Sequence, residues 1–182
     1  VKIHVTTMSQ AFKQIGARRG RPRPVVACPW SKRAKNKRMA QIQALLASLP
    51  ADEVAVYEDE VDIHLNPKLG LDWMNRGRQK EVVTPGQNEK RYLAGAMGAE
   101  SGRLTVVEGK RKKSALFIEL INALIEAYPK AKRIHVILNN YRIHSSKITQ
   151  KALAKHEDRV VLHLLPPYCP NENKIDRLWQ DL

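Results

Sequence analysis

The sequence predicts an α/β fold in which a mixed β-sheet is flanked by helices, with a small, basic helical segment at the N-terminal side. Three observations predict it. Residues 52–108 are dominated by short runs rich in Val and other strand-forming residues. Residues 114–182 alternate between helical and strand patterns, as in sheets that contain parallel strands. Residues 1–50 contain eleven Lys and Arg and no Asp or Glu.

The charge distribution indicates a polyanionic partner. The 182 residues carry a formal net charge of +14, and the part after residue 50 holds 21 of the 32 basic residues against all 18 acidic ones. The N-terminal quarter is therefore a polycation. Nucleic acid suits it better than a membrane surface, because no strongly amphipathic basic helix stands out and no apolar run approaches ~20 residues. The alternative is a solvated basic face or solubility tail.

The first unit, residues 1–24, combines a short helix with a basic linker. Val5, Met8, Phe12 and Ile15 recur at helical spacing, which predicts a helix over residues 5–15. It is either the last helix of a helix-turn-helix or a frayed amphipathic terminus. The linker contains Pro22 and Pro24 and should be extended, so that it either places arginines in a DNA minor groove or only connects. These arginines are Arg18, Arg19, Arg21 and Arg23.

Residues 25–50 form the second unit, a basic connecting helix over 30–48. The third unit, residues 51–182, carries the sheet. Four strands are expected first, over Glu53–Leu65, Arg78–Thr84, Arg91–Ala99 and Leu104–Glu108. A helix over 114–128 follows, because its apolar residues line one face. The remaining elements are strand Ile134–Leu138, helix Ser146–His156, strand Val160–Leu165 and a final helix after Pro170.

Acidic residues lie within the first of these strands. Carboxylates in a Val-rich strand cost free energy unless they are exposed, paired or bound to a metal. We expect Glu58, Glu60 and Asp62 to be solvated on an edge strand, and we single out Asp59 for a functional role.

Three motifs in the chain resemble those of mariner-like transposases, in particular the bacterial insertion-sequence six-thirty group. Residues 165–179, LPPYCPNENKIDRLW, match a pattern that closes the catalytic domain of that family, with Asp176 in the place of its Glu. Residues 134–144 match an apolar strand that ends in Asp-Asn with a His four residues later, but Asn139 replaces the Asp. Asp59-Glu60 matches the family's Asp-Glu after an apolar strand.

Weaker matches extend the resemblance over nearly the whole chain. Trp73 and Gly77 fall in a Trp-x-x-x-Gly stretch, and Gly20–Pro24 resembles the basic linker that precedes the catalytic part. The resemblance implies an RNase H-like domain over 51–182, truncated at its C-terminal side, and a remnant of a helix-turn-helix DNA-binding part in residues 1–24. It also implies a DDE-type endonuclease that performs cut-and-paste DNA recombination.

The resemblance further implies a metal site formed by Asp59, Asn139 and Asp176, with Mg²⁺ as the metal and Mn²⁺ as a substitute. Strand cleavage and transfer use two such ions roughly 4 Å apart, bound by oxygen ligands. Asn139 removes one negative charge, either by deliberate substitution or by natural decay of the element. We therefore expect the chain to bind DNA but to cleave it poorly or not at all.

The expected partners are double-stranded DNA, as terminal inverted repeats and target, and a second copy of the chain in a homodimer. Cys28 and Cys169 lie far apart in the sequence and indicate a reducing setting, so a cytoplasmic, nucleoid-associated location in a bacterium is expected. Further DNA contacts are expected from a basic turn and one histidine, although a solvated charge run and a packing histidine are equal alternatives. These residues are Lys110, Arg111, Lys112, Lys113 and His144.

Two other functions remain open at this point. One is a non-catalytic DNA-binding protein derived from a transposase, which Asn139 favours. The other is a different RNase H-like nuclease or integrase. An RNA-binding domain ranks below both, because no RNA-recognition motif is present.

Overall fold

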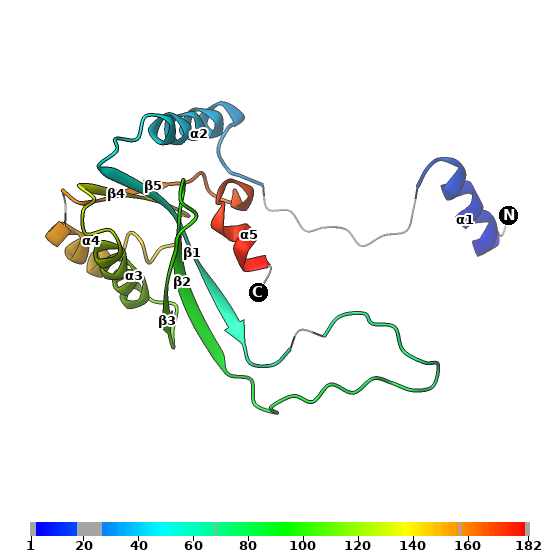
Figure 1. Cartoon of the computed structure of the whole chain (residues 1–182). Helices are drawn as coiled ribbons and strands as arrows, with labels where there is room; N and C mark the ends of the chain where they lie inside the picture. Colours follow the sequence, from blue (N-terminus) through cyan, green and yellow to red (C-terminus); the bar gives the residue numbers. More distant parts are fainter. Residues whose placement is uncertain (1–2, 18–26, 68, 157, 181–182) are drawn as a thin grey trace.

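The computed structural model describes residues 3–17, 27–67, 69–156 and 158–180. A five-stranded sheet forms the centre, with strand order β3-β2-β1-β4-β5 (Figure 1). Its strands are β1 (Glu53–His64), β2 (Lys90–Gly98), β3 (Leu104–Gly109), β4 (Arg133–Leu138) and β5 (Val160–Leu164). The first three are antiparallel, whereas β4 and β5 run parallel to β1. The predicted mixed sheet is confirmed.

Helices cover both faces of this sheet (Figure 1). One face packs against α3 (Ser114–Ala127) and α4 (Lys147–Leu153), and its core contains Val56, Phe117 and Val136. The other face packs against α2 (Lys32–Ala47) and α5 (Ile175–Gln180) through a smaller core. That core consists of Ile42, Tyr57, Ile137, Leu165 and Ile175. Because side chains alternate along a strand, adjacent residues of β1 face different layers.

The N-terminal helix α1 (Val5–Gln14) is confirmed as a helix, but none of its residues is buried. Its apolar stripe remains exposed, with Val5 at 78% and Ile15 at 76%. The linker arginines Arg18, Arg19, Arg21 and Arg23 lie outside the described residues. The helix-turn-helix remnant and the minor-groove arm therefore stay predictions.

The predicted strand over Arg78–Thr84 is wrong. Described residues between β1 and β2 form a long connection without helix or strand, drawn as the extended loop in Figure 1. Because β1 pairs directly with β2, residues 78–84 do not lie between these two strands in the sheet. Trp73 and Val83 are almost fully exposed, so Trp73 is not a core residue.

Candidate active site

Asp59, Asn139 and Asp176 converge at one cavity from three different elements. Asp59 lies on β1, Asn139 directly follows β4, and Asp176 lies in the first turn of α5. The parallel register, with Tyr57 opposite Ile137, extends to place Asn139 beside Asp59. All three residues line a cavity of about 580 Å³, together with the loop that runs from Leu165 to Asn173.

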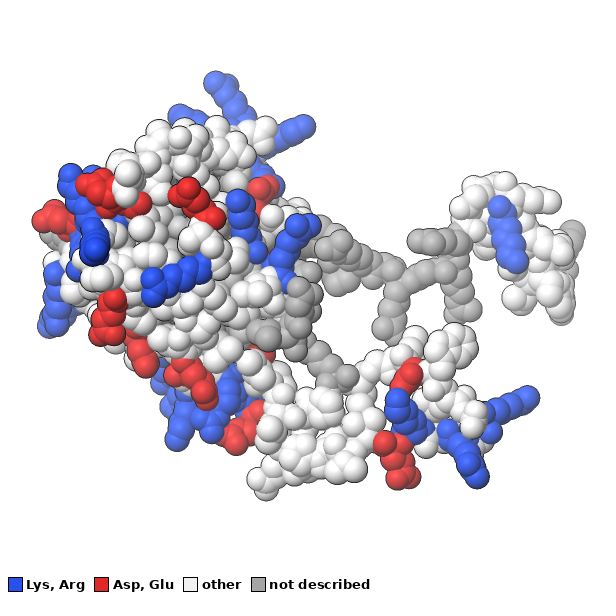
Figure 2. Space-filling model, viewed as in Figure 1, with Lys and Arg blue, Asp and Glu red and all other residues white. Residues whose placement is uncertain are grey.

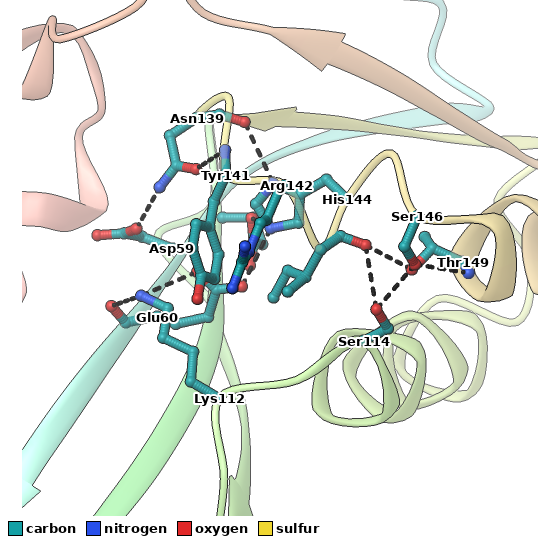
Figure 3. Close-up of polar contacts among 12 residues, drawn as sticks. Asp59, Glu60, Lys112, Ser114, Asn139, Tyr141, Arg142, His144, Ser146 and Thr149 are labelled. Carbon is teal, nitrogen blue, oxygen red and sulfur yellow. Dashed lines mark hydrogen bonds and ion pairs between the residues drawn. The ribbon is translucent and has the colours of Figure 1, made fainter.

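A direct hydrogen bond joins the first two of these residues. Asn139 Nδ2 donates to Asp59 Oδ1 over 2.8 Å (Figure 3). The Tyr141 backbone N–H donates to Asn139 Oδ1, also over 2.8 Å. That second bond determines which way the amide points, because a flipped amide would set its NH2 group against the Tyr141 N–H. Asn139 therefore presents a hydrogen-bond donor to Asp59.

Asp176 lines the same cavity as Asp59. Burial, followed by a hydrogen bond with Asp176 and the charge of that carboxylate, raises the pKa of Asp59 to about 7. Ionised carboxylates that lie near each other repel, and a cation between them would compensate their charges. The pair is thus electrostatically unfavourable when both members are ionised.

A close approach between β2 and α5 positions Asp176. Gly95 lies opposite Asp59 in the β1–β2 ladder, and a Cβ atom at Gly95 would lie 2.6 Å from the ring of Trp179. The absence of a side chain at Gly95 therefore lets Trp179 seat α5 on the sheet. Asn173 adds a second attachment, because its buried Nδ2 donates to the Glu58 carbonyl over 2.8 Å.

On the other face of β1, Glu58 and Glu60 form a buried cluster with His144 and Lys112. His144 Nε2 lies 3.0 Å from Glu60 Oε1 and 3.6 Å from Glu58 Oε2, and its Nδ1 lies 3.2 Å from the Asn139 carbonyl oxygen. Lys112 Nζ lies 3.3 Å from Glu60 Oε2 (Figure 3). His144 therefore links Glu60, the neighbour of Asp59, to the backbone of Asn139.

The expectation that Glu58 and Glu60 are solvated is wrong. β1 is the central strand, so alternation points these side chains into the α3 layer, where both are fully buried. Burial and the charges of Glu60 and Asp59 raise the pKa of Glu58 well above its usual value, and Lys112 opposes this effect. Asp62, further along β1, is exposed as expected.

The expected contact between His144 and a DNA phosphate does not fit this geometry. The His144 side chain is 1% exposed, both ring nitrogens face protein acceptors, and its ring packs 4.5 Å from that of Phe117. The packing alternative describes it better. The sequence did contain a signal for the cluster around His144: Glu58 and Glu60 are two residues apart, so both lie on one face of a strand.

The basic turn between β3 and α3 divides into two kinds of side chain. Lys110, Arg111 and Lys113 are exposed, whereas Lys112 turns inward to Glu60 and stacks 4.9 Å over the Tyr141 ring. Figure 2 shows Lys and Arg side chains gathered near the end of β3. Three of the four residues thus remain free to contact a phosphate backbone.

The cavity fits a divalent cation only in part. The carboxylates of Asp59 and Asp176 offer the oxygen ligands that Mg²⁺ prefers. The side-chain NH2 group of Asn139 points to Asp59, and its side-chain oxygen Oδ1 already accepts a hydrogen bond from the Tyr141 backbone N–H. The ligand atoms of Glu58, Glu60 and His144 also lie within 4.8 Å of one another, but Lys112 already compensates charge there.

Residues 54–182 match the sequence model of the DDE superfamily endonuclease family. The chain belongs to this family. Over 148 residues it is 49% identical to a protein of Shigella sonnei described as the insertion element IS630 uncharacterized 39 kDa protein. That match covers 81% of the chain and 43% of the relative, so the chain spans less than half of the relative's length.

Solved structures show the same fold at low identity. The Mos1 transposase paired-end complex with the left transposon end gives a TM-score of 0.64 at 16% identity, over 97% of this chain and 55% of that one. The Mos1 mariner paired-end complex with Mg gives a TM-score of 0.61 at 15% identity, over 97% and 56%. The RNase H-like fold and the resemblance to mariner and IS630 proteins are confirmed. Within the described part of the chain, every helix is too short or too polar to cross a membrane.

Proposed function

We propose that this chain contains the catalytic core of a cut-and-paste DNA transposase whose metal-dependent cleavage is impaired by Asn139. The convergence of Asp59, Asn139 and Asp176 at one cavity carries the proposal. Two of the three are carboxylates, the oxygen ligands that can hold the metal ions of phosphodiester hydrolysis and strand transfer. The DDE endonuclease family and the IS630 relative support the same reaction.

Asp59 and Asp176 are the residues proposed to hold Mg²⁺, or Mn²⁺ in its place. A bound divalent cation would supply a more acidic water and stabilise the leaving oxygen. The solved Mos1 complexes with Mn and with Mg support this choice of metals. Asn139 weakens the site in two ways, because it lacks a negative charge and because its N–H group occupies the Asp59 oxygen.

Double-stranded DNA is the proposed partner, as transposon ends and as target, and the assembly is a proposed homodimer. The net charge of +14 supports a polyanionic ligand. Exposed Lys110, Arg111 and Lys113 lie on the same β3–α3 turn as Lys112, which lines the cavity. The Mos1 neighbours were solved as paired-end and pre-cleavage complexes.

The alternative function is a non-catalytic DNA-binding protein derived from a transposase. The hydrogen bond between Asn139 and Asp59 favours this alternative, because the amide gives the Asp59 carboxylate a partner without a cation. Both functions predict DNA binding, and they differ only in metal-dependent cleavage.

The deciding experiment compares the chain with its Asn139→Asp variant. Both are incubated with a supercoiled plasmid that carries the two ends of the insertion element, with Mg²⁺ or with EDTA. We expect the variant to nick at least about 100-fold faster, because a restored metal ligand is worth several kcal/mol in the transition state. Asn122→Asp, on the exposed face of α3, is the matched control for the added charge.

Equal Mg²⁺-dependent nicking by the unaltered chain and the Asn139→Asp variant would remove Asn139 from the metal site. Nicking by neither protein, with DNA binding retained by both, would favour the non-catalytic function. Mn²⁺ binding, followed by electron paramagnetic resonance, gives a readout that does not depend on turnover.

A further inference from the structure

A buried group of side chains that commonly bind metals lies on the α3 side of β1, on the face opposite to Asp59. It consists of Glu58, Glu60 and His144, and one ligand atom from each residue lies within 4.8 Å of the other two. His144 Nε2 is 3.0 Å from Glu60 Oε1 (Figure 3) and 3.6 Å from Glu58 Oε2. In a tetrahedral site with bonds of about 2.1 Å, neighbouring ligand atoms are about 3.4 Å apart. The two measured distances bracket that spacing.

The ring of His144 is oriented as in metal-binding histidines. Its Nδ1 lies 3.2 Å from the Asn139 carbonyl oxygen, which can only accept, so Nδ1 carries the proton and donates it. Nε2 then faces the oxygens of Glu58 and Glu60, which are acceptors when they are ionised. Histidine ligands commonly donate their second ring N–H to a backbone carbonyl, and this bond fixes which nitrogen is left for the metal. In His144 that nitrogen is Nε2.

An unpaired buried carboxylate accompanies this geometry. The Glu58 side chain is fully buried, and among the described residues neither of its carboxylate oxygens has a hydrogen-bond partner. Lys112 Nζ lies 3.3 Å from Glu60 Oε2 and therefore compensates only one of the two buried glutamates. A charged and unpaired carboxylate in a protein interior is costly, and a cation bound by both glutamates would remove that cost.

We propose that Glu58, Glu60 and His144 bind one divalent transition-metal ion, with Zn²⁺ as the fitting species, at a site separate from the cavity lined by Asp59 and Asp176. One imidazole and two carboxylates suit Zn²⁺ better than Mg²⁺, which prefers oxygen ligands and retains several waters. The two glutamates lie on β1 and His144 follows β4, so the ion would join neighbouring strands behind the candidate active site. The proposal requires neither cleavage nor DNA binding.

The test titrates the complete chain, after treatment with a chelator, with Co²⁺ as the spectroscopic substitute for Zn²⁺ at neutral pH. We expect one equivalent of Co²⁺ to produce the visible absorption bands of a four-coordinate site with nitrogen and oxygen ligands. Zn²⁺ should remove these bands by displacing the Co²⁺. At a concentration of about 100 times its dissociation constant, Zn²⁺ should also raise the melting temperature by roughly 5–10 °C.

The decisive variant is Glu58→Gln, because Gln imitates the neutral carboxyl and should leave the metal-free fold intact. Its affinity for Co²⁺ should fall by at least about 100-fold, because a direct ligand is lost. His144→Gln should have the same effect. Glu119→Gln and His4→Gln, both at exposed positions, are the matched controls and should bind as the unaltered chain does. Asp176→Asn, in the candidate active site, should also retain the bands.

Three results would overturn the proposal. Co²⁺ binding that Asp176→Asn abolishes, or that Glu58→Gln leaves intact, would place the ion elsewhere. An intense thiolate charge-transfer band would assign the ion to a cysteine. An absence of bands, with a melting temperature that does not respond to Zn²⁺, would show that protons alone balance the charges of Glu58 and Glu60. None of these readouts involves DNA, so such a failure would leave the proposed function unaffected.

Discussion

Asn139 Nδ2 donates a hydrogen bond to Asp59 Oδ1 over 2.8 Å, at the place where an aspartate would leave two carboxylates facing each other. The amide therefore stabilises Asp59 without a cation. We therefore expect replacement of Asn139 to change how the stability and the activity of the site respond to metal.

The first prediction concerns stability in the Asn139→Asp variant. Without metal, a third carboxylate beside Asp59 and Asp176 should lower the melting temperature, because like charges repel in a partly buried site. Mn²⁺ or Mg²⁺ should restore it in the variant and have little effect on the unaltered chain. Differential scanning fluorimetry with and without metal measures both, and Asn122→Asp provides the charge-matched comparison. A metal response of equal size in all three proteins would contradict the assignment.

The second prediction concerns the seat of α5. Gly95→Ala should force the Trp179 ring away, because the added Cβ would lie 2.6 Å from it. We expect a loss of about 1–3 kcal/mol in the free energy of unfolding, measured in urea. Gly70→Ala is the control, because nothing lies within 4 Å of its added Cβ. Trp179→Leu should relieve part of the cost in the double variant, and strict additivity would show that the two residues do not meet.

The third prediction separates the two buried glutamates. Glu58→Gln should change the free energy of unfolding little at pH 7, because its raised pKa favours the neutral carboxyl that Gln imitates. Glu60→Gln should cost about 2–4 kcal/mol, because it breaks pairs with both Lys112 and His144. The two substitutions control each other, since they are chemically identical and two residues apart. An equal loss of unfolding free energy in both variants would show that Glu60 is not paired more strongly than Glu58.

The fourth prediction concerns pH. Burial, then the charges of His135 and Arg38, lower the pKa of His163 to about 4, and His135 Nδ1 lies 2.9 Å from its Nε2. The unfolded chain takes up this proton near pH 6.5, so stability should fall as the pH decreases from about 6.5 to 4. The difference in pKa between the folded and unfolded chain allows a loss of at most ~3 kcal/mol in the free energy of unfolding. Solvent around the half-buried ring reduces this loss to about 1–2 kcal/mol.

Urea unfolding at pH 7 and pH 5 tests this effect. His163→Gln should lose less stability between the two values than the unaltered chain does, whereas His4→Gln, at an exposed position, should lose as much. Glu53 does not account for this loss, because the hydrogen bond from His135 lowers the pKa of Glu53. The stability that Glu53 contributes is therefore lost only in more acidic solution. Parallel pH profiles for His163→Gln and the unaltered chain would exclude His163 as the cause.

The fifth prediction concerns the basic turn. Changing Lys110 and Lys113 to Gln should weaken DNA binding and reduce the slope of log affinity against log salt by roughly one for each lost phosphate contact. The same double change at exposed Lys130 and Lys132, beyond α3, removes equal charge and should have less effect. Fluorescence anisotropy with labelled duplex at several salt concentrations measures this. Equal losses from both pairs would indicate a general charge effect without a defined surface.

Much of the fold could be predicted from the sequence, because the signals are local. The helical spacing of Leu116, Leu120 and Leu124 and the apolar run Ile134–Leu138 each specify an element by periodicity. The strand expected over Arg78–Thr84 failed for the opposite reason. Strand propensity describes a half-buried pleated surface, and only a neighbouring strand can supply one.

The three candidate site positions were proposed from the sequence, because the residues that flank Asp59, Asn139 and Asp176 form specific motifs. Their mutual geometry was not. The direction of the Asn139 amide depends on the Tyr141 backbone, and the position of Asp176 depends on Gly95 and Trp179. The burial of Glu58 and Glu60 depends on the central place of β1 in the sheet.

The sequence by itself thus determined the class of fold and the family resemblance, and it supplied the candidate site residues. Only the tertiary structure decided which polar groups face each other: Asn139 with Asp59, and His144 with Glu60. The physical reason is distance along the chain. Periodicity and motif spacing act over a few residues, whereas these contacts join positions 80 or more residues apart, and packing of the two helical layers on the sheet brings them together.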